Sequence, residues 1–203
     1  MKKIFGRIVF CAVFAVICWS ALLIADRQTL DNGLIRFHVV AHSDSQEDQT
    51  IKLSVRDAVL ESIQSDLQKV ADIQEAKNYI QRNLPKIQRI ADQTLQELGF
   101  HGSAKVSMCK EAFHVRNYDT FSLPSGVYDS LRIVIGNGEG KNWWCVSFPT
   151  LCISATVSEF EDTAVSAGFS KPLVKTLTGK EAYELRFYLL DQLGKLENIL
   201  FHG

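Results

Sequence analysis

The sequence lacks an excess of basic residues, and this absence excludes one large class of partners. Its 203 residues include 22 Lys and Arg against 23 Asp and Glu. The first 25 residues hold three of the basic side chains and no acidic one, so 19 basic and 23 acidic residues remain beyond them, a net charge of −4. Because nucleic-acid binding needs a basic face that neutralises phosphates, we expect no nucleic-acid partner. The acidic balance also gives this part of the chain no attraction to an anionic membrane surface.

Cysteine is scarce, and its distribution limits the disulfides that can form. The chain has five cysteines, of which Cys11 and Cys18 lie in an apolar N-terminal segment. Cys109, Cys145 and Cys152 remain. This odd number is compatible with one disulfide and one free thiol, or with three buried thiols, and the sequence does not choose the pairing.

Charged side chains are missing from residues 8–25, where an apolar run follows three basic residues within residues 1–7. This order is typical of an export signal. The run lies near the lower limit for crossing a bilayer, for which about 20 apolar residues are usual. A cleaved signal peptide and an uncleaved membrane anchor, in contact with the bilayer, are both compatible with residues 1–25. We expect residues 26–203 to be exported as one domain, a length that suffices for a hydrophobic core.

The first part of the exported chain predicts one strand and two helical stretches. Residues 34–41 alternate apolar and polar side chains, as in a strand. Ser45 stands three residues before an acidic residue and predicts the N-terminal cap of a helix over residues 46–67. A second helical stretch runs over residues 72–98, and we expect a kink where Pro85 interrupts it.

Beyond residue 104 the period of the apolar residues changes to two, which predicts strands. Residues 131–135 and 143–148 are joined by a glycine-rich loop, and we expect them to pair as a β-hairpin. Leucines three and four residues apart predict a final helix over residues 182–200. The expected fold class is α+β, a single exported domain with an N-terminal strand and helices, a central β-hairpin sheet and a C-terminal helix.

The glycine-rich loop, residues 136–142, invites a phosphate-binding interpretation, because backbone N–H groups in such loops can hold anions. Its spacing does not fit that use. Ile135 stands where a Walker-type loop needs a glycine, and Asn142 stands where it needs a hydroxyl side chain. We therefore interpret the loop as a flexible turn between strands.

His38, His42 and Asp44 are of residue types that bind zinc. On an extended strand the two histidines lie about 13 Å apart, too far to share one ion. We therefore interpret residues 43–45 as a turn whose side-chain oxygens cap the following helix, and we predict no metal site and no cofactor.

Cys145 is the strongest candidate nucleophile, since a thiolate beside a histidine forms a catalytic pair. Nothing in the sequence places a histidine next to it. A disulfide between Cys145 and Cys152 and a buried structural thiol are the competing interpretations, and each is favoured over catalysis. The alternative function is therefore an exported cysteine-dependent hydrolase that uses Cys145 and a histidine.

Trp143 and Trp144 are adjacent on a predicted strand, so their rings must point to opposite faces. At least one of them can then lie outside the main core, and exposed tryptophans concentrate in the hot spots of protein interfaces. We predict a partner-binding surface that contains Trp143 and Trp144 with the neighbouring Lys141 and Phe148. In a regular strand Phe148 shares the face of Trp144. No catalytic residue is predicted.

Several separated motifs occur in the order found in one family of signalling proteins. They are Ser43-Asp-Ser45, Val55-Arg-Asp-Ala-Val59, Pro124-Ser-Gly-Val-Tyr128, Leu131-Arg-Ile-Val-Ile-Gly136 and Gly140-Lys-Asn-Trp-Trp-Cys-Val146, with Phe148-Pro149 and Leu151-Cys152. In these motifs the chain resembles the stage II sporulation protein R family of endospore-forming bacteria. The resemblance covers residues 34–152 in motifs and the N-terminal segment in character.

The resemblance implies a protein made in the forespore and exported into the intermembrane space between forespore and mother cell. The family triggers a membrane-embedded aspartic protease of the mother cell, which cleaves the propeptide of pro-sigma-E. No catalytic residue is carried over from the family. The function that the resemblance implies is therefore activation of this protease by binding rather than by catalysis.

Overall fold

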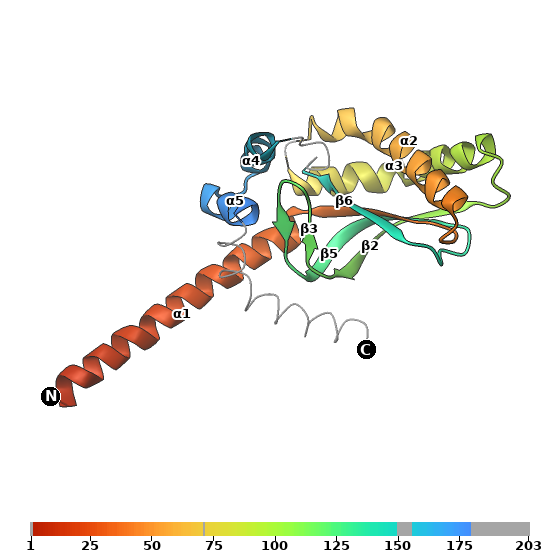
Figure 1. Cartoon of the computed structure of the whole chain (residues 1–203). Helices are drawn as coiled ribbons and strands as arrows, with labels where there is room; N and C mark the ends of the chain where they lie inside the picture. The colour runs from red at the N-terminus through yellow and green to blue at the C-terminus, as the bar shows by residue number, and fades with distance from the viewer. Residues whose placement is uncertain (1, 71, 150–155, 180–203) are drawn as a thin grey trace.

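The computed structural model describes residues 2–70, 72–149 and 156–179. A long N-terminal helix leads into a domain in which two helices cover one face of a β-sheet (Figure 1). The helices are α1 (Lys2–Gly33), α2 (Gln46–Leu67), α3 (Ile73–Glu97), α4 (Val157–Ser166) and α5 (Lys171–Thr178). The strands are β1 (Ile35–Val40), β2 (Ala104–Phe113), β3 (Arg116–Asn117), β4 (Ser122–Leu123), β5 (Gly126–Ile135) and β6 (Asn142–Phe148). The α+β class predicted from the sequence is confirmed.

A mixed four-stranded sheet, in the order β2-β5-β1-β6, forms the centre of the domain. β1 pairs in parallel with β5 and antiparallel with β6, and β2 pairs antiparallel with β5. The predicted hairpin between residues 131–135 and 143–148 is therefore wrong, because β1 lies between the two strands. All six residues of β1 are buried, and a strand that is buried on both faces is stable at the centre of a sheet rather than at its edge.

The helices α2 and α3 begin where the sequence predicts. Ser45 and Asp72 are their N-caps, and each side chain accepts a hydrogen bond from the backbone N–H three residues farther on. α3 is not interrupted at Pro85 but runs through it. Proline has no N–H for the carbonyl oxygen of Gln81, yet both residues are exposed, so water can take the place of the missing bond.

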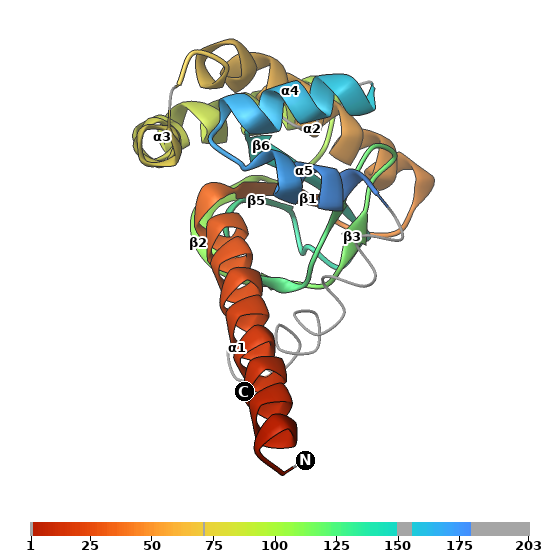
Figure 2. The same cartoon turned by 90° about the vertical axis from the view of Figure 1, so that its left-hand side faces the viewer.

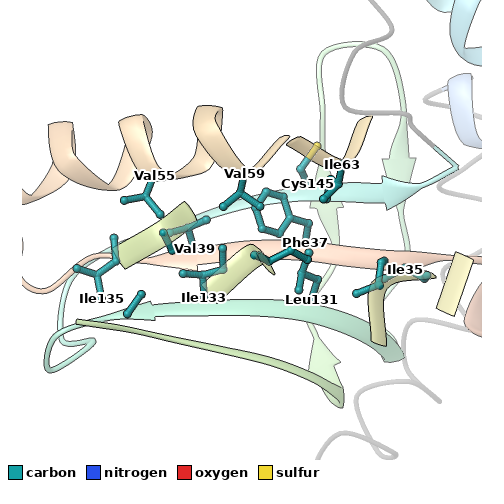
Figure 3. Close-up of a cluster of buried hydrophobic side chains, with 14 of the residues drawn as sticks. Ile35, Phe37, Val39, Val55, Val59, Ile63, Leu131, Ile133, Ile135 and Cys145 are labelled. Atoms are coloured by element: carbon teal, nitrogen blue, oxygen red, sulfur yellow. The ribbon is translucent and has the colours of Figure 1, made fainter. Parts of the chain in front are cut away.

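The main core lies between the sheet and the helices α2 and α3 (Figure 3). Alternate residues of β1 and β5 point toward the helices, as the two-residue period of a strand requires. Burial of each large apolar side chain stabilises the fold by about 1.5–3 kcal/mol, which explains why both helices lie on this face. Buried members include Ile35, Phe37, Val39, Leu131 and Ile133 of the sheet and Val55, Val59, Ile63, Ile80 and Ile87 of the helices.

A second cluster of buried side chains joins the end of α1 to β4, β5, α4 and α5. Leu23 and Leu30 of α1 belong to it, so the last turns of this helix pack on the domain. The predicted boundary between residues 25 and 26 thus falls inside one continuous helix. α1 projects away from the domain over the rest of its length (Figure 2), and it is long and apolar enough to cross a membrane.

The chain after β6 forms two short helices in a region where the sequence shows weak periodicity. Thr156 and Glu159 form a capping box at the start of α4, and Ser170 caps α5. Phe160 and Leu173 anchor the two helices in the second cluster. The helix predicted over residues 182–200 lies outside the described residues.

Candidate functional site

The loops that follow the parallel strands β1 and β5 lie against each other and are joined by hydrogen bonds. We call residues 41–45 and 136–141 the loop clasp. The N–H of Gly140 donates to the carbonyl oxygen of Ala41 at 3.0 Å, and the next N–H along the chain donates to Asp44 Oδ1 at 2.7 Å. The clasp brings the motif Ser43-Asp-Ser45 against the start of the motif Gly140-Lys-Asn-Trp-Trp-Cys-Val146, and it holds the start of β6 in place.

His42 takes part in the clasp through its backbone and its ring. Its carbonyl oxygen accepts a hydrogen bond from the N–H of Glu139 at 3.2 Å, and its Nδ1 accepts one from the N–H of Asn137 at 3.0 Å. The ring also meets Phe100 edge-on, with 5.5 Å between ring centroids. His42 is therefore a structural residue of the clasp. In the part of the chain that the structure describes, no group of three or more His, Cys, Asp or Glu side chains could hold a metal ion.

The turn predicted over residues 43–45 caps α2. The N–H of Asp48 donates to Ser45 Oγ at 3.1 Å, and the N–H of Ser45 donates to Ser43 Oγ at 3.1 Å. The Ser43 hydroxyl in turn donates to the Asp48 carboxylate. These polar groups satisfy one another, and the interpretation of the segment as a helix cap is confirmed.

Trp143 and Trp144 point to opposite faces of the sheet, as predicted, and each is partly exposed. On the face of α2, the Trp143 ring meets Phe37 edge-on at 5.8 Å, and Arg56 Cζ lies 4.7 Å from the Trp143 ring centroid. Arg56 also binds the carboxylate of Asp57 through two hydrogen bonds of 2.7 and 2.9 Å. The charge of this arginine is therefore matched locally.

On the opposite face, Trp144 stacks on His38 with 4.7 Å between ring centroids and 4° between ring planes. Phe113 meets the same indole edge-on at 5.2 Å. Arg116 of β3 lies over the Trp144 ring, 4.8 Å from its centroid. Within the described residues Arg116 forms no ion pair with a carboxylate, which distinguishes this tryptophan–arginine pair from the one on the other face.

Phe148 does not lie with Trp144. A register shift in the pairing of β1 with β6 leaves Ser147 outside the ladder as a β-bulge. The bulge turns Phe148 to the face of Trp143, where it is 4% exposed in the main core. The prediction that Phe148 shares the face of Trp144 is therefore wrong, while its role in binding a partner stays a prediction. Lys141 is exposed immediately before β6.

Beside Trp144 lies a polar cluster that the sequence did not predict. His38 Nε2 is 2.8 Å from Glu111 Oε2, and Arg132 Nη1 is 3.2 Å from Glu111 Oε1. Burial by itself raises the pKa of Glu111, but the hydrogen bond and charge of His38 and the charge of Arg132 outweigh it. The pKa of Glu111 therefore lies below its ordinary value, and this carboxyl group is ionised at neutral pH.

Arg36 is completely buried behind this cluster and has no carboxylate partner within the described residues. Its Nη2 donates to the Tyr118 hydroxyl at 3.0 Å, while its Nε and Nη1 meet no hydrogen-bond acceptor in the described part of the chain. The rings of Phe113, Tyr128 and Tyr118 lie 4.5, 5.3 and 5.9 Å from Arg36 Cζ. Burial lowers the pKa of the Arg36 guanidinium, and the nearby charge of Arg116 lowers it further.

Among the residues that the structure describes, no histidine is paired with Cys145 as a hydrolase would need. Cys145 is disulfide-bonded, 4% exposed, and points into the main core toward α2 (Figure 3). The predicted partner Cys152 lies outside the described residues, so this pairing stays a prediction. His38 points to the opposite face of the sheet. Cys109 is a free thiol whose pKa is raised by burial, and a raised pKa disfavours the reactive thiolate.

Comparison with known proteins places these features in one family. A family model described as stage II sporulation protein R matches residues 31–158, which include the loop clasp and both tryptophans of β6. The chain is similar to stage II sporulation protein R of Bacillus subtilis (strain 168), with 32% identity over 180 residues that cover 80% of each chain. No solved structure matches the chain.

Proposed function

The chain belongs to the stage II sporulation protein R family, and from this membership we propose that it is an exported sporulation signal that acts by binding rather than by catalysis. Its partner is the membrane-embedded aspartic protease of the mother cell that processes pro-sigma-E. The chain reaches this protease from the forespore side, in the intermembrane space. The apolar helix α1, near the N-terminus, is compatible with export by a signal peptide or a membrane anchor.

The observation that carries the proposal of a binding role is the pair of partly exposed tryptophans on β6, each with an arginine over its ring. Tryptophan and arginine are the residues most enriched in the energetic hot spots of interfaces. β6 is paired with β1, and the loop clasp holds its start by hydrogen bonds, so the site is largely formed before a partner binds.

Activation by binding has a thermodynamic requirement. The exported domain can shift the protease toward its active state only if it binds that state more tightly than the inactive one. A tenfold shift in the equilibrium needs a difference of about 1.4 kcal/mol in binding free energy, which a single tryptophan contact can supply.

The test is cleavage of pro-sigma-E in a non-sporulating host that makes the cognate membrane protease, with and without export of this chain. We expect cleavage only when the chain is exported. Cys145→Ser should preserve cleavage wherever the variant still folds, because no thiol chemistry is involved. Absence of cleavage with both wild-type proteins present and folded would remove the proposed function, and loss of cleavage in a folded Cys145→Ser variant would favour the hydrolase.

A further inference from the structure

The sheet face that carries Trp144 concentrates positive charge in a chain whose exported part is acidic overall. Arg36, Arg116 and Arg132 lie on this face, and Glu111 is the acidic residue that pairs with one of them, Arg132. Arg132 and Arg116 reach the surface, whereas Arg36 lies behind them. Two guanidinium groups, those of Arg36 and Arg116, are thus left without a carboxylate among the described residues.

These two guanidinium groups act on each other and on the same phenol. Arg36 donates to the Tyr118 hydroxyl at 3.0 Å. Burial raises the pKa of Tyr118, and the charges of Arg36 and Arg116 offset only part of that rise. A buried cation without a matching anion destabilises the folded state, because the protein interior solvates charge less well than water does. An anion that approached Arg116 would also be attracted by the charge of Arg36, since fields act over longer distances in a medium of low dielectric constant.

The arginine over Trp143 differs from the arginine over Trp144 in its carboxylate contacts, and this difference favours Trp144 as the binding position. Arg56 lies over Trp143 at nearly the same distance as Arg116 over Trp144, but both of its carboxylate contacts are made within the chain, to Asp57. A second carboxylate would compete with an existing bidentate pair there. At Arg116 no such competitor is present in the described part of the chain.

We propose that Arg116, backed by the buried Arg36 and flanked by Trp144, binds a carboxylate side chain on an acidic segment of the partner protein. This inference rests on the proposed function and names the face of β6 and the chemistry that it recognises. The planar guanidinium of Arg116 can hold a carboxylate through two parallel hydrogen bonds. The exposed part of the Trp144 ring receives an apolar side chain of the same segment. A nucleic acid is a poor fit, because its phosphates need a broad basic surface and this one is confined to a few residues.

The first arm of the test measures capture of the detergent-solubilised membrane protease by the full-length chain, together with cleavage of pro-sigma-E. Arg116→Gln should weaken capture by about tenfold or more, as expected for removal of a charged hot-spot contact. Arg116→Lys, which keeps the charge but not the planar fork, should recover part of it. The matched control is Arg89→Gln, which removes one positive charge from an exposed position on α3, and it should leave capture within about twofold of wild type.

The second arm separates this inference from the proposed function. The full-length chain is titrated with a hexaglutamate peptide and with hexaglutamine, and binding is followed by calorimetry at low and high salt. We expect salt-sensitive binding of hexaglutamate alone, lost in Arg116→Gln and kept in Arg89→Gln. That result would support the site even if wild-type chain failed to trigger cleavage. If cleavage depends on the chain but Arg116→Gln matches the control in both arms, or Arg56→Gln has the larger effect, the carboxylate site at Trp144 is wrong while the function stands.

Discussion

Gly140→Ala is expected to lower the free energy of unfolding by about 3 kcal/mol, because the loop clasp has no room for a Cβ atom at this position. A Cβ built on Gly140 would lie 2.2 Å from the carbonyl oxygen of Ser43 and 2.5 Å from its carbonyl carbon. It would also lie 2.9 Å from the Cβ of Ala41. The first two contacts are with backbone atoms, which cannot rotate away as a side chain can.

The magnitude follows from the hydrogen bonds that hold the two loops together. Relief of the overlap requires the loops to separate by roughly 1 Å, which breaks the bond from Gly140 to Ala41 and strains its neighbours from Glu139 and Lys141. Three such bonds contribute about 0.5–1.5 kcal/mol each. An alternative in which the bonds persist and the loop is overpacked costs about 1–3 kcal/mol, so a loss of about 3 kcal/mol lies within the range of the first route and at the upper end of the second.

Thermal unfolding of the full-length chain in detergent, followed by circular dichroism, measures the effect. A loss of about 3 kcal/mol corresponds to a fall in Tm of roughly 6–12 °C for a chain of this size. Gly102→Ala is the control, because the three atoms nearest its new Cβ all belong to the ring of Phe100, the closest at 2.6 Å, and this partly buried side chain can turn where a backbone cannot. Equal Tm values for the two variants would refute the role assigned to the clasp.

Three further variants test the electrostatics of the fold. Arg36→Met should leave Tm unchanged or raise it, since it replaces a buried, uncompensated charge by an apolar side chain of similar size; a fall of more than about 5 °C would contradict this reasoning. The pKa of Glu111 is lowered in the folded chain, so its ionised form stabilises the fold at pH values above its ordinary pKa of about 4.3. This contribution is lost as the pH falls through the folded-state pKa of Glu111. Glu111→Gln should therefore flatten the dependence of Tm on pH below about 4.5. Burial and a 2.8 Å hydrogen bond to Asp66 raise the pKa of Tyr79 to about 12. Its contribution to stability is therefore fully present below its ordinary pKa of about 10 and is lost as the pH rises from there through the folded-state pKa of about 12. Absorbance titration should show one late-ionising phenol fewer in Tyr79→Phe, and an unchanged titration would contradict the assignment.

Local signals in the sequence determined most of the secondary structure. The helix predicted over residues 46–67 is α2 with the same bounds, because the Ser45 cap and the apolar spacing act within a few residues of each other. The opposite directions of Trp143 and Trp144 also follow from the sequence, since the period of a strand is local. The continuity of α3 through Pro85 depends on the exposure of that face, which sequence periodicity does not report.

The candidate site was predictable only in part. Trp143 and Trp144 could be named from the sequence, but the burial of Phe148 depends on a bulge at Ser147 that only the pairing with β1 reveals. In the cluster around Glu111, this residue contacts His38 on another strand, and the two residues are 73 positions apart in the sequence. No local pattern carries such a contact.

The amino-acid sequence by itself determined the apolar N-terminal segment, the acidic balance of residues 26–203, the caps of the helices and the alternation along the strands. Each of these depends on the properties of a residue and its near neighbours. Only the tertiary structure decided that β1 lies between β5 and β6, and that Arg36 and Arg116 share one face with Trp144. Those outcomes depend on which strand buries both of its faces and on the register of distant strands, and these are settled by packing of the whole chain.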